Sequence, residues 1–227
     1  MQKDNRWTET IKSTLTQTKQ YLATLSIKVR TGQFKLFKKI IKPKITDKVL
    51  DVGVDTHEIL RDSNMFEKLY GPQKNITAAT IENPKAFKKL YSKVKVVKIV
   101  PGRKLPFKNN KFDITVSWAT LEHVGGYKEQ EYFLNELLRV GKKIFVTTPY
   151  RGCIYEPHSG FFFIHWFPLT LFRLLCRKTK KEFWATENNL NPLYVGDIKR
   201  MNLRRKVNIV VYKMFNLLPS HLILYTN

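Results

Sequence analysis

Residues 48–54 read KVLDVGV, a short apolar run with Gly53 near its end. Runs of this kind are typical of a strand that is buried on both faces of a parallel sheet. The next segment, EILRDSNMFEKLY at residues 58–70, can form a helix, and it is followed by Gly71 and Pro72, which end helices. Together the two segments predict a first strand–helix unit.

The strand–helix unit is repeated along the chain. Helices are predicted over NPKAFKKLYSKVK, with Asn83 as the N-cap, and over residues 129–140, whose apolar side chains share one face. Strands are predicted at residues 76–81, 94–100, 112–118 and 142–148, followed by a hairpin of residues 207–215 and 221–226. This alternation predicts an α/β fold with a Rossmann-like seven-stranded, mostly parallel sheet, helices on both faces and a C-terminal antiparallel hairpin.

Two parts of the chain fall outside this pattern. Residues 1–45 read as a basic helical N-terminal leader, because apolar residues recur at helical spacing before the Lys-rich stretch that begins at Lys35. We expect residues 46–227 to form the main domain. Within it, residues 150–196 interrupt the alternation with the aromatic segment GFFFIHWFPLTLFRLLC. We therefore expect a substrate-capping insert at about 150–196.

The chain is strongly basic. It carries 41 Lys and Arg residues against 18 Asp and Glu residues, a formal charge of +23. A field of this sign attracts phosphates, anionic lipid headgroups and acidic glycans. The lysines are scattered through every segment, however, as a coding bias would also scatter them. Nucleic acid therefore stays open as a partner, and so does peripheral contact with an anionic membrane.

Cysteine usage and the N-terminal segment bear on metals and location. Cys153 and Cys176 are too few for a disulfide framework and form no metal-ligand cluster with a nearby histidine pair, so we expect no metal site. The N-terminal segment is polar and contains no apolar run of the kind that signal peptides have. We expect a cytoplasmic protein, with peripheral contact at the inner face of the membrane as an open alternative.

Two stretches carry a family resemblance. VLDVGV at residues 49–54 and LPFKNNKFDITVSWATLEHV at residues 105–124 resemble motifs of the class I S-adenosylmethionine-dependent methyltransferases, in particular the methyltransferase type 11-like group. The resemblance implies six parallel strands and one reversed strand that bind S-adenosylmethionine at their carboxyl ends. ELLRVGKKIFVTTPYR at residues 136–151, and EPH followed by HW within residues 156–166, are similar to a narrower subgroup from bacterial surface-polysaccharide loci.

The resemblance implies S-adenosyl-L-methionine as the cofactor, bound at the ends of the strands. Asp51 and Gly53 would meet its methionine end, although Val54 and Asp55 stand where the family usually has further glycines. Glu82 follows the second strand, where a carboxylate can accept both ribose hydroxyls. The residues expected to line the cofactor cleft are Asp51, Gly53, Val54, Asp55, Glu82, Leu105, Ser117 and Trp118.

Transfer of a methyl group to a hydroxyl needs close positioning and a base that removes the hydroxyl proton. A neutral imidazole can do this near pH 7. We expect His158 to be the base and Glu156 to orient it, because a Glu two residues before a His can share its proton. His123, in the segment LEHV, and His165, in FIHWFP, are alternatives. Each of these side chains also has a structural interpretation, as a solvated group or a partner of neighbouring backbone.

The apolar stretch Phe161–Cys176 is shorter than the roughly 20 residues that span a bilayer. It also contains Pro168 and Arg173. We favour a lid over the cofactor as its role, and a segment at a membrane interface is the alternative.

The resemblance favours O-methylation of a sugar hydroxyl on a cell-envelope glycan or its lipid-linked precursor. The acceptor glycan would then be the main partner, and the sequence leaves the oligomeric state open. The positive charge alone would also fit an RNA methyltransferase, although no RNA-binding motif is visible. The altered glycine loop would fit a catalytically degenerate protein that keeps the fold for binding.

Overall fold

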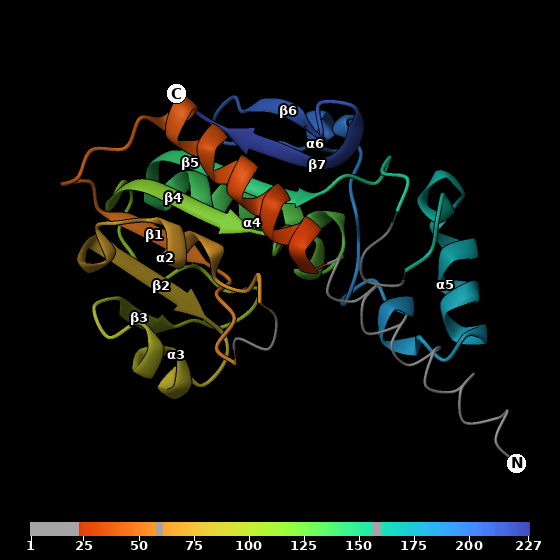
Figure 1. Cartoon of the computed structure of the whole chain (residues 1–227), viewed down its shortest axis with the longest axis horizontal. Helices are drawn as coiled ribbons and strands as arrows, with labels where there is room; N and C mark the ends of the chain where they lie inside the picture. The colour runs from red at the N-terminus through yellow and green to blue at the C-terminus, as the bar shows by residue number, and fades with distance from the viewer. Residues whose placement is uncertain (1–22, 58–60, 156–159) are drawn as a thin grey trace, which may run out of the picture.

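The computed structural model describes residues 23–57, 61–155 and 160–227. Its centre is a seven-stranded sheet with the order β3-β2-β1-β4-β5-β7-β6 (Figure 1). β7 runs antiparallel to both β5 and β6, and the other neighbouring strands are parallel. The predicted fold class is therefore confirmed. The strands are β1 (Val49–Val52), β2 (Ile76–Thr80), β3 (Lys95–Lys98), β4 (Phe112–Trp118), β5 (Gly141–Pro149), β6 (Asn208–Met214) and β7 (Leu218–Tyr225).

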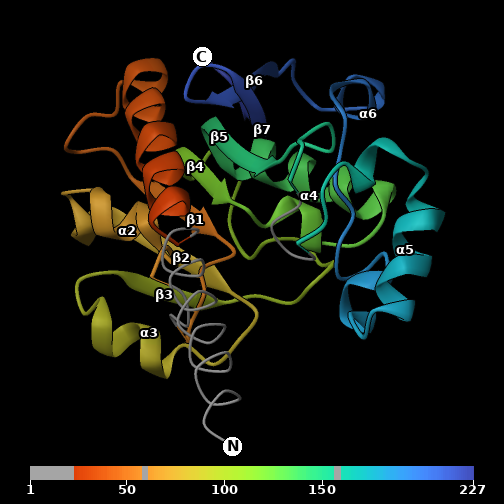
Figure 2. The same ribbon diagram turned by 45° about the vertical axis from the view of Figure 1, so that its right-hand side comes forward.

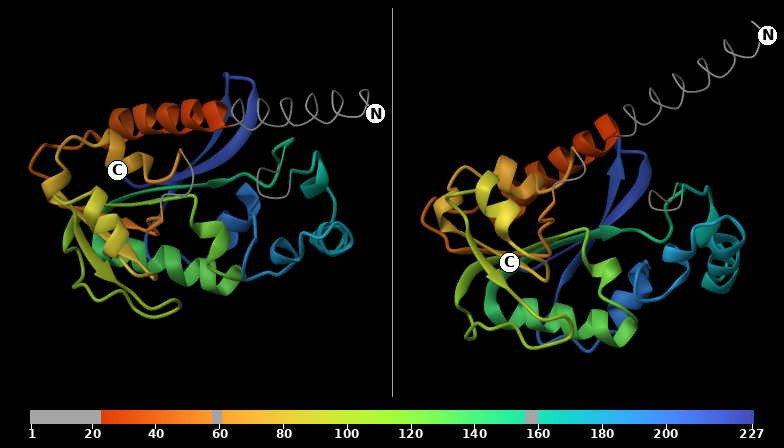
Figure 3. Two further views of the ribbon diagram at one scale, coloured as in Figure 1. Left: turned by 60° about the horizontal axis from the view of Figure 1, so that its bottom comes forward. Right: turned by 90° about the horizontal axis from the view of Figure 1, so that it is seen from below.

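Helices cover both faces of the sheet, as Figure 3 shows. The helical residues 23–41, together with α2 and α3, pack on one face, and α4 packs on the other. The α-helices are α2 (Met65–Leu69), α3 (Lys85–Leu90), α4 (Tyr127–Val140), α5 (Leu169–Lys178) and α6 (Val195–Arg200). Short 3-10 helices are η1 (Gln73–Asn75), η2 (Leu121–His123), η3 (Ile164–Trp166) and η4 (Glu182–Ala185). None of the helices in the described part of the chain is long and apolar enough to cross a membrane.

The central strands are buried on both faces because alternate side chains enter two different cores. Leu50 and Val52 of β1 pack in the core under α4, whereas Val49 packs in the core under helix 23–41. Phe37 of that helix is fully buried, and its ring centre lies 5.3 Å from that of Phe145 in β5. The basic N-terminal helix is thus packed into the main core over its described residues.

Element boundaries differ from the prediction at several places. The helix predicted over residues 83–95 is shortened to α3, whose N-cap is Pro84 and not Asn83. The helix predicted over residues 58–70 is shortened to α2, because residues 61–64 form turns; residues 58–60 lie outside the described residues. Asn64 adopts a left-handed conformation with φ 50°, and its side chain bonds both the N–H and the carbonyl of Asp55. The last hairpin turns at Phe215 and Asn216, so that β7 begins at Leu218 and not at residue 221.

A further difference concerns α4. It begins at Tyr127, before the predicted residue 129, and it ends directly at Gly141, the first residue of β5. A Cβ atom at Gly141 would lie 2.3 Å from Oγ1 of Thr115 and 3.0 Å from the carbonyl of Lys143. The direct passage from helix to strand therefore requires glycine.

The segment predicted as an insert contains η3, α5 and η4. It lies beyond the carboxyl ends of the parallel strands, at the edge of the molecule (Figures 1 and 2). The segment has a small core of its own, formed by Ile164, Phe172, Cys176, Ala185 and Leu190.

Candidate active site

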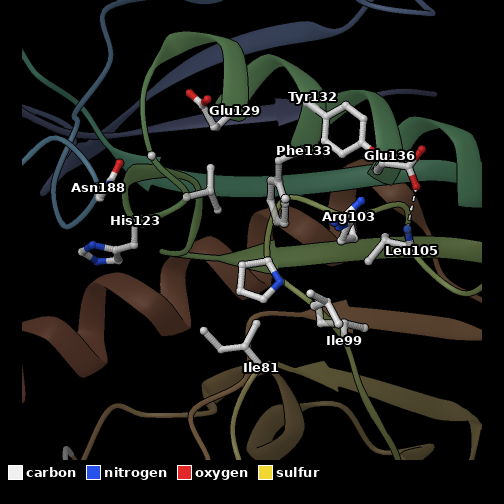
Figure 4. A pocket seen from close by; sticks show the side chains of 15 residues that line it. Ile81, Ile99, Arg103, Leu105, His123, Glu129, Tyr132, Phe133, Glu136 and Asn188 are labelled. Atoms are coloured by element: carbon white, nitrogen blue, oxygen red, sulfur yellow. Dashed lines mark hydrogen bonds between the residues drawn. The ribbon is translucent and has the colours of Figure 1, made fainter.

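Three pockets lie side by side over the carboxyl ends of β1, β2 and β4. The first, the α4-side pocket, has a volume of about 300 Å³ and is shown in Figure 4. The second, the central pocket, shares Ile81, Ile99 and His123 with the first. The third, the α2-side pocket, shares Gly53 and Asp55 with the central pocket. The shared residues make the three pockets one continuous cleft.

Gly53 places the loop after β1 against the loop after β4. Its φ is +100°, and an added Cβ atom would lie 2.2 Å from Oγ1 of Thr120. The N–H of Gly53 donates to the carbonyl of Ala79 at 2.9 Å, which ties the loop to β2 as well. Only a residue without a side chain allows this approach. The glycine therefore fixes the floor of the cleft.

Val54 and Asp55 follow in the positions where the resemblance leads one to expect glycines. Val54 is buried among apolar side chains. The Asp55 carboxylate accepts hydrogen bonds from the hydroxyl of Ser63 at 2.6 Å and from the N–H of His57 at 2.9 Å. Asp55 thus holds the loop in shape through its side chain, while both residues line the central and α2-side pockets.

Glu82 lies just past β2 on the central pocket. Its side chain is 44% exposed, and it accepts a hydrogen bond from the hydroxyl of Thr56. Nδ1 of His57 lies 3.4 Å from the same carboxylate oxygen. The ligand atoms of Asp55, His57 and Glu82 are also close enough together to hold a cation, although their hydrogen bonds already account for the arrangement. The Glu82 carboxylate is therefore held in one orientation, and it is exposed enough to accept hydrogen bonds from further hydroxyl groups.

A Glu82→Ala variant should bind S-adenosylhomocysteine more weakly by about 1.5–3 kcal/mol, the usual loss for a charge-assisted hydrogen bond. Thr56→Val should weaken binding less, because it removes only the hydroxyl that orients Glu82. Isothermal titration calorimetry would give both affinities, and thermal melting would show whether the fold is kept. Equal affinity in wild type and Glu82→Ala would mean that the carboxylate does not contact the ribose.

Asp51 and Glu67 form a buried carboxyl pair on the α2-side pocket. Asp51 is 4% exposed and Glu67 is fully buried, and both line the pocket. Burial raises the pKa of Asp51 to about 7. Hydrogen bonding to Glu67 and to the Val52 amide lowers this pKa, but by less than burial raises it. The pair therefore holds a proton under conditions in which exposed carboxyls are ionised. Arg30, from helix 23–41, lines the same pocket and is paired with Asp62 at 3.0 Å.

The free energy of unfolding should fall as pH rises through about 7, because a carboxyl with a raised pKa stabilises the fold only while it keeps its proton. Each unit of pKa difference between the folded and unfolded states is worth about 1.4 kcal/mol. Asp51→Asn should weaken this dependence, since an amide does not ionise. Urea unfolding at about pH 5 and about pH 8.5 measures the effect. The same slope in both proteins would show that Asp51 is already ionised.

The remaining residues expected at the cofactor lie in three different environments. The N–H of Leu105 donates to Glu136 at 2.8 Å, and Leu105 lines the α4-side pocket (Figure 4). Trp118 lines the α2-side pocket, and its indole N–H has no hydrogen-bond partner among the described residues. Ser117 is fully buried within β4, where its hydroxyl donates to the carbonyl of Val52 at 2.8 Å. Ser117 is not among the residues that line the three pockets.

Among the candidate bases, His123 lies in the cleft. It lines both the α4-side and the central pockets, and its Nδ1 is 2.6 Å from the carbonyl oxygen of Asn189. Because a carbonyl only accepts, Nδ1 carries the proton in the neutral ring and Nε2 can accept one. Nε2 is 3.8 Å from the buried Glu122 carboxylate. His123 thus has one ring nitrogen bound to the backbone and the other beside a carboxylate.

The other three candidates are placed differently. His165 is 2% exposed, and its ring packs against Phe172 in the insert, with 4.6 Å between ring centres. It does not line the three pockets. Glu156 and His158 lie outside the described residues.

Sequence reasoning missed several side chains of the cleft. Glu67 and Arg30 line the α2-side pocket, and Phe183 and Trp184 line the central pocket from the insert. Glu67 has the sequence appearance of an exposed helical residue, so only its contacts reveal its burial. The paired aromatics Phe183 and Trp184 were visible in the insert, but no pattern indicated which way they face.

Comparison with known proteins identifies a family over the strands that build the cleft. Residues 50–144 match the model of a family described as methyltransferase domain. A comparison with curated protein sequences gives no match. The matched range holds Asp51, Gly53, Glu82 and His123, so it contains most of the residues that line the cleft.

Solved structures are similar in fold. An S-adenosylmethionine-dependent methyltransferase from Mesorhizobium loti has a TM-score of 0.53 at 10% identity, over 82% of this chain and 94% of its own. The PH0226 protein from Pyrococcus horikoshii has a TM-score of 0.53 at 15% identity, over 85% and 86%. A protein from Rhodobacter sphaeroides that is provisionally named a zinc-dependent alcohol dehydrogenase has a TM-score of 0.54 at 12% identity, over 85% and 88%. At these identities the likeness concerns the fold alone.

Proposed function

We propose that the chain is an S-adenosylmethionine-dependent methyltransferase that methylates a sugar hydroxyl of a cell-envelope glycan or of its lipid-linked precursor; the match of residues 50–144 to a methyltransferase domain supports the reaction. The cofactor supplies the methyl group. The residues of the chain bind the cofactor, position the acceptor beside it and take up the hydroxyl proton.

The three pockets fit the three parts of the cofactor. The α4-side pocket offers apolar side chains to a flat base, including Ile81, Ile99 and Phe133 (Figure 4). Glu82 offers a carboxylate to the ribose hydroxyls in the central pocket. Asp51 and Glu67 offer a buried carboxyl pair to the ammonium group of the methionine part. Apolar, hydroxyl-binding and cation-binding surfaces thus follow one another in the order that the cofactor requires.

The aromatic wall of the central pocket is the observation that best supports a sugar acceptor. Phe183 is 63% exposed and lines the pocket beside Trp184. The ring of Trp184 lies 6.0 Å from that of His123, measured between ring centres. Exposed aromatic faces pack well against the C–H face of a sugar ring, whose hydroxyls then project from its edge. A sugar held on this wall would bring a hydroxyl near His123.

His123 is the described side chain best placed to accept the hydroxyl proton. Its Nδ1 is held by the Asn189 carbonyl, which leaves Nε2, 3.8 Å from the Glu122 carboxylate, as the nitrogen that would accept the proton. The alternative base, His158 with the support of Glu156, stays a prediction.

The test is methyl transfer from labelled S-adenosylmethionine to three acceptors: polyprenyl-linked glycan precursors, the same glycans without lipid, and transfer RNA. We expect label in the glycan samples, and we expect Trp184→Ala to raise KM for the glycan more than KM for the cofactor. Phe215→Ala changes an aromatic residue outside the cleft, in the β6–β7 turn, and serves as the control. Label in RNA alone would replace the glycan proposal with an RNA methyltransferase. Cofactor binding without transfer to any of the three would favour a binding protein.

A further inference from the structure

The insert presents an unusual number of large apolar side chains to solvent. They come from a short stretch around η3 and the first part of α5, which we call the insert patch. Its members, with their exposed fractions, are Phe162 (65%), Phe163 (45%), Trp166 (58%), Phe167 (52%), Leu171 (37%) and Leu174 (45%). Scattered apolar residues are normal on protein surfaces, but a contiguous patch marks an interaction site.

The insert patch is distinct from the core of the insert. α5 buries Phe172 and Cys176 completely against the rest of the insert, whereas Leu171 and Leu174 point away from that core. The helix therefore has two apolar faces, and only one of them is used in folding. Phe163 has φ 56°, a costly conformation for a bulky residue, and its ring packs edge-on against Trp166 with 5.1 Å between ring centres.

The charged residues within 160–181 are all positive. Residues 160–181 contain no Asp or Glu, and five cations follow or interrupt the apolar residues: Arg173, Arg177, Lys178, Lys180 and Lys181. Lys178 is four residues after Leu174, so the exposed apolar stripe of α5 ends in a positive charge. Aromatic side chains bordered by lysine and arginine match the interface of an anionic bilayer, with rings at headgroup depth and cations at the phosphates. A second copy of the patch would instead bring like charges together.

We propose that residues 160–181 dock the enzyme on an anionic membrane. The rings and leucines of the insert patch enter the headgroup region, and the cations that border it contact lipid phosphates. The insert lies beyond the carboxyl ends of the parallel strands (Figure 2), on the side of the molecule where the cleft is built. Docking through the insert would therefore keep the cleft near the bilayer surface. The proposal concerns binding alone and holds whichever acceptor is methylated.

The experiment measures sedimentation of the full chain with vesicles of phosphatidylcholine alone or of phosphatidylcholine mixed with phosphatidylglycerol. We expect binding to the mixed vesicles only, lost at high salt. The double variant Trp166→Ala/Phe167→Ala should bind about tenfold more weakly. Lys178→Gln and Lys180→Gln should each weaken binding about fivefold.

Matched controls separate docking from general surface properties. Phe215→Ala removes an aromatic side chain of equal exposure, and Lys88→Gln/Lys89→Gln removes two exposed charges from α3. Both should bind vesicles as the wild type does. Equal losses in patch and control variants would show that only net charge matters. If the chain forms dimers without lipid, and Trp166→Ala/Phe167→Ala makes them dissociate, the patch binds a second copy of the chain. If transfer RNA competes with vesicles for the patch, the patch binds nucleic acid. Each of these results overturns the proposal.

Discussion

A Gly53→Ala variant should lose S-adenosylhomocysteine binding by about 100-fold or more, because a misplacement of about 1 Å in a binding loop is enough for such a loss. The new methyl group would meet both Oγ1 and Cγ2 of Thr120 within 2.5 Å, at a φ of +100° that alanine rarely adopts. The loops after β1 and β4 must then separate. We expect the free energy of unfolding to fall as well, by about 2–5 kcal/mol.

Gly71→Ala is the matched control for this substitution. A Cβ atom at Gly71 would meet nothing within 4 Å, so the same chemical change should leave binding and stability close to those of the wild type. Calorimetric titration gives the affinity and urea unfolding gives the stability. Full binding by Gly53→Ala would show that the cofactor does not depend on the contact between these two loops.

An Arg139→Ala variant should lose about 3–5 kcal/mol of stability, the usual consequence of leaving one charge of a buried pair alone. Arg139 and Glu136 are bonded at 2.6 Å, with side chains 5% and 6% exposed. Arg139 also donates to the carbonyls of Leu105 and Phe107, so it fixes the loop that borders the α4-side pocket. Denaturant unfolding measures the loss.

Arg200→Ala provides the control. Arg200 pairs with Asp197 at the same spacing of three residues and the same 2.6 Å, but its side chain is 72% exposed. Its removal should cost about 1 kcal/mol or less. Comparable losses in the two variants would contradict the role assigned to burial.

The ion pair of Arg139 and Glu136 should also affect how the free energy of unfolding changes at acid pH. Burial tends to raise the pKa of Glu136, but the Arg139 guanidinium and the Leu105 amide outweigh it and hold that pKa below its usual range. A carboxyl with a lowered pKa stabilises the fold above its ordinary range, and this contribution is lost as pH falls through the lowered value. Arg139→Ala should therefore lose less stability on acidification than the wild type does.

The sheet could be predicted from sequence because its strands are short and apolar on both faces. KVLDVGV and FDITVSW have no other stable placement than the centre of a parallel sheet, and they form β1 and β4. Helix ends were harder to predict. The periodicity of residues 58–70 does not reveal that Asn64 uses its side chain to hold Asp55, a contact across the loop that delays the helix to Met65.

The cleft was predictable to the extent that it follows from strand ends. Gly53 could be placed because it directly follows β1, and Glu82 because it comes two residues after β2. Ser117 shows the limit of this reasoning. It comes one residue before the end of β4, and the pleat directs its hydroxyl to β1 and not to the cleft. The burial of Glu67 could not be predicted, because a buried Glu and an exposed Glu look the same in a helical pattern.

The packing of helix 23–41 has a consequence for the synthesis of the chain. Phe34, Phe37 and Ile41 are made early, but they share their core with Phe145 of β5 and Ile223 of β7, the last strand of the sheet. On the ribosome, the apolar face of this helix stays exposed until nearly all of the sheet has emerged. Folding during translation can therefore secure the first strand–helix units, but the core under this helix closes only afterwards, which gives chaperones a defined segment to protect.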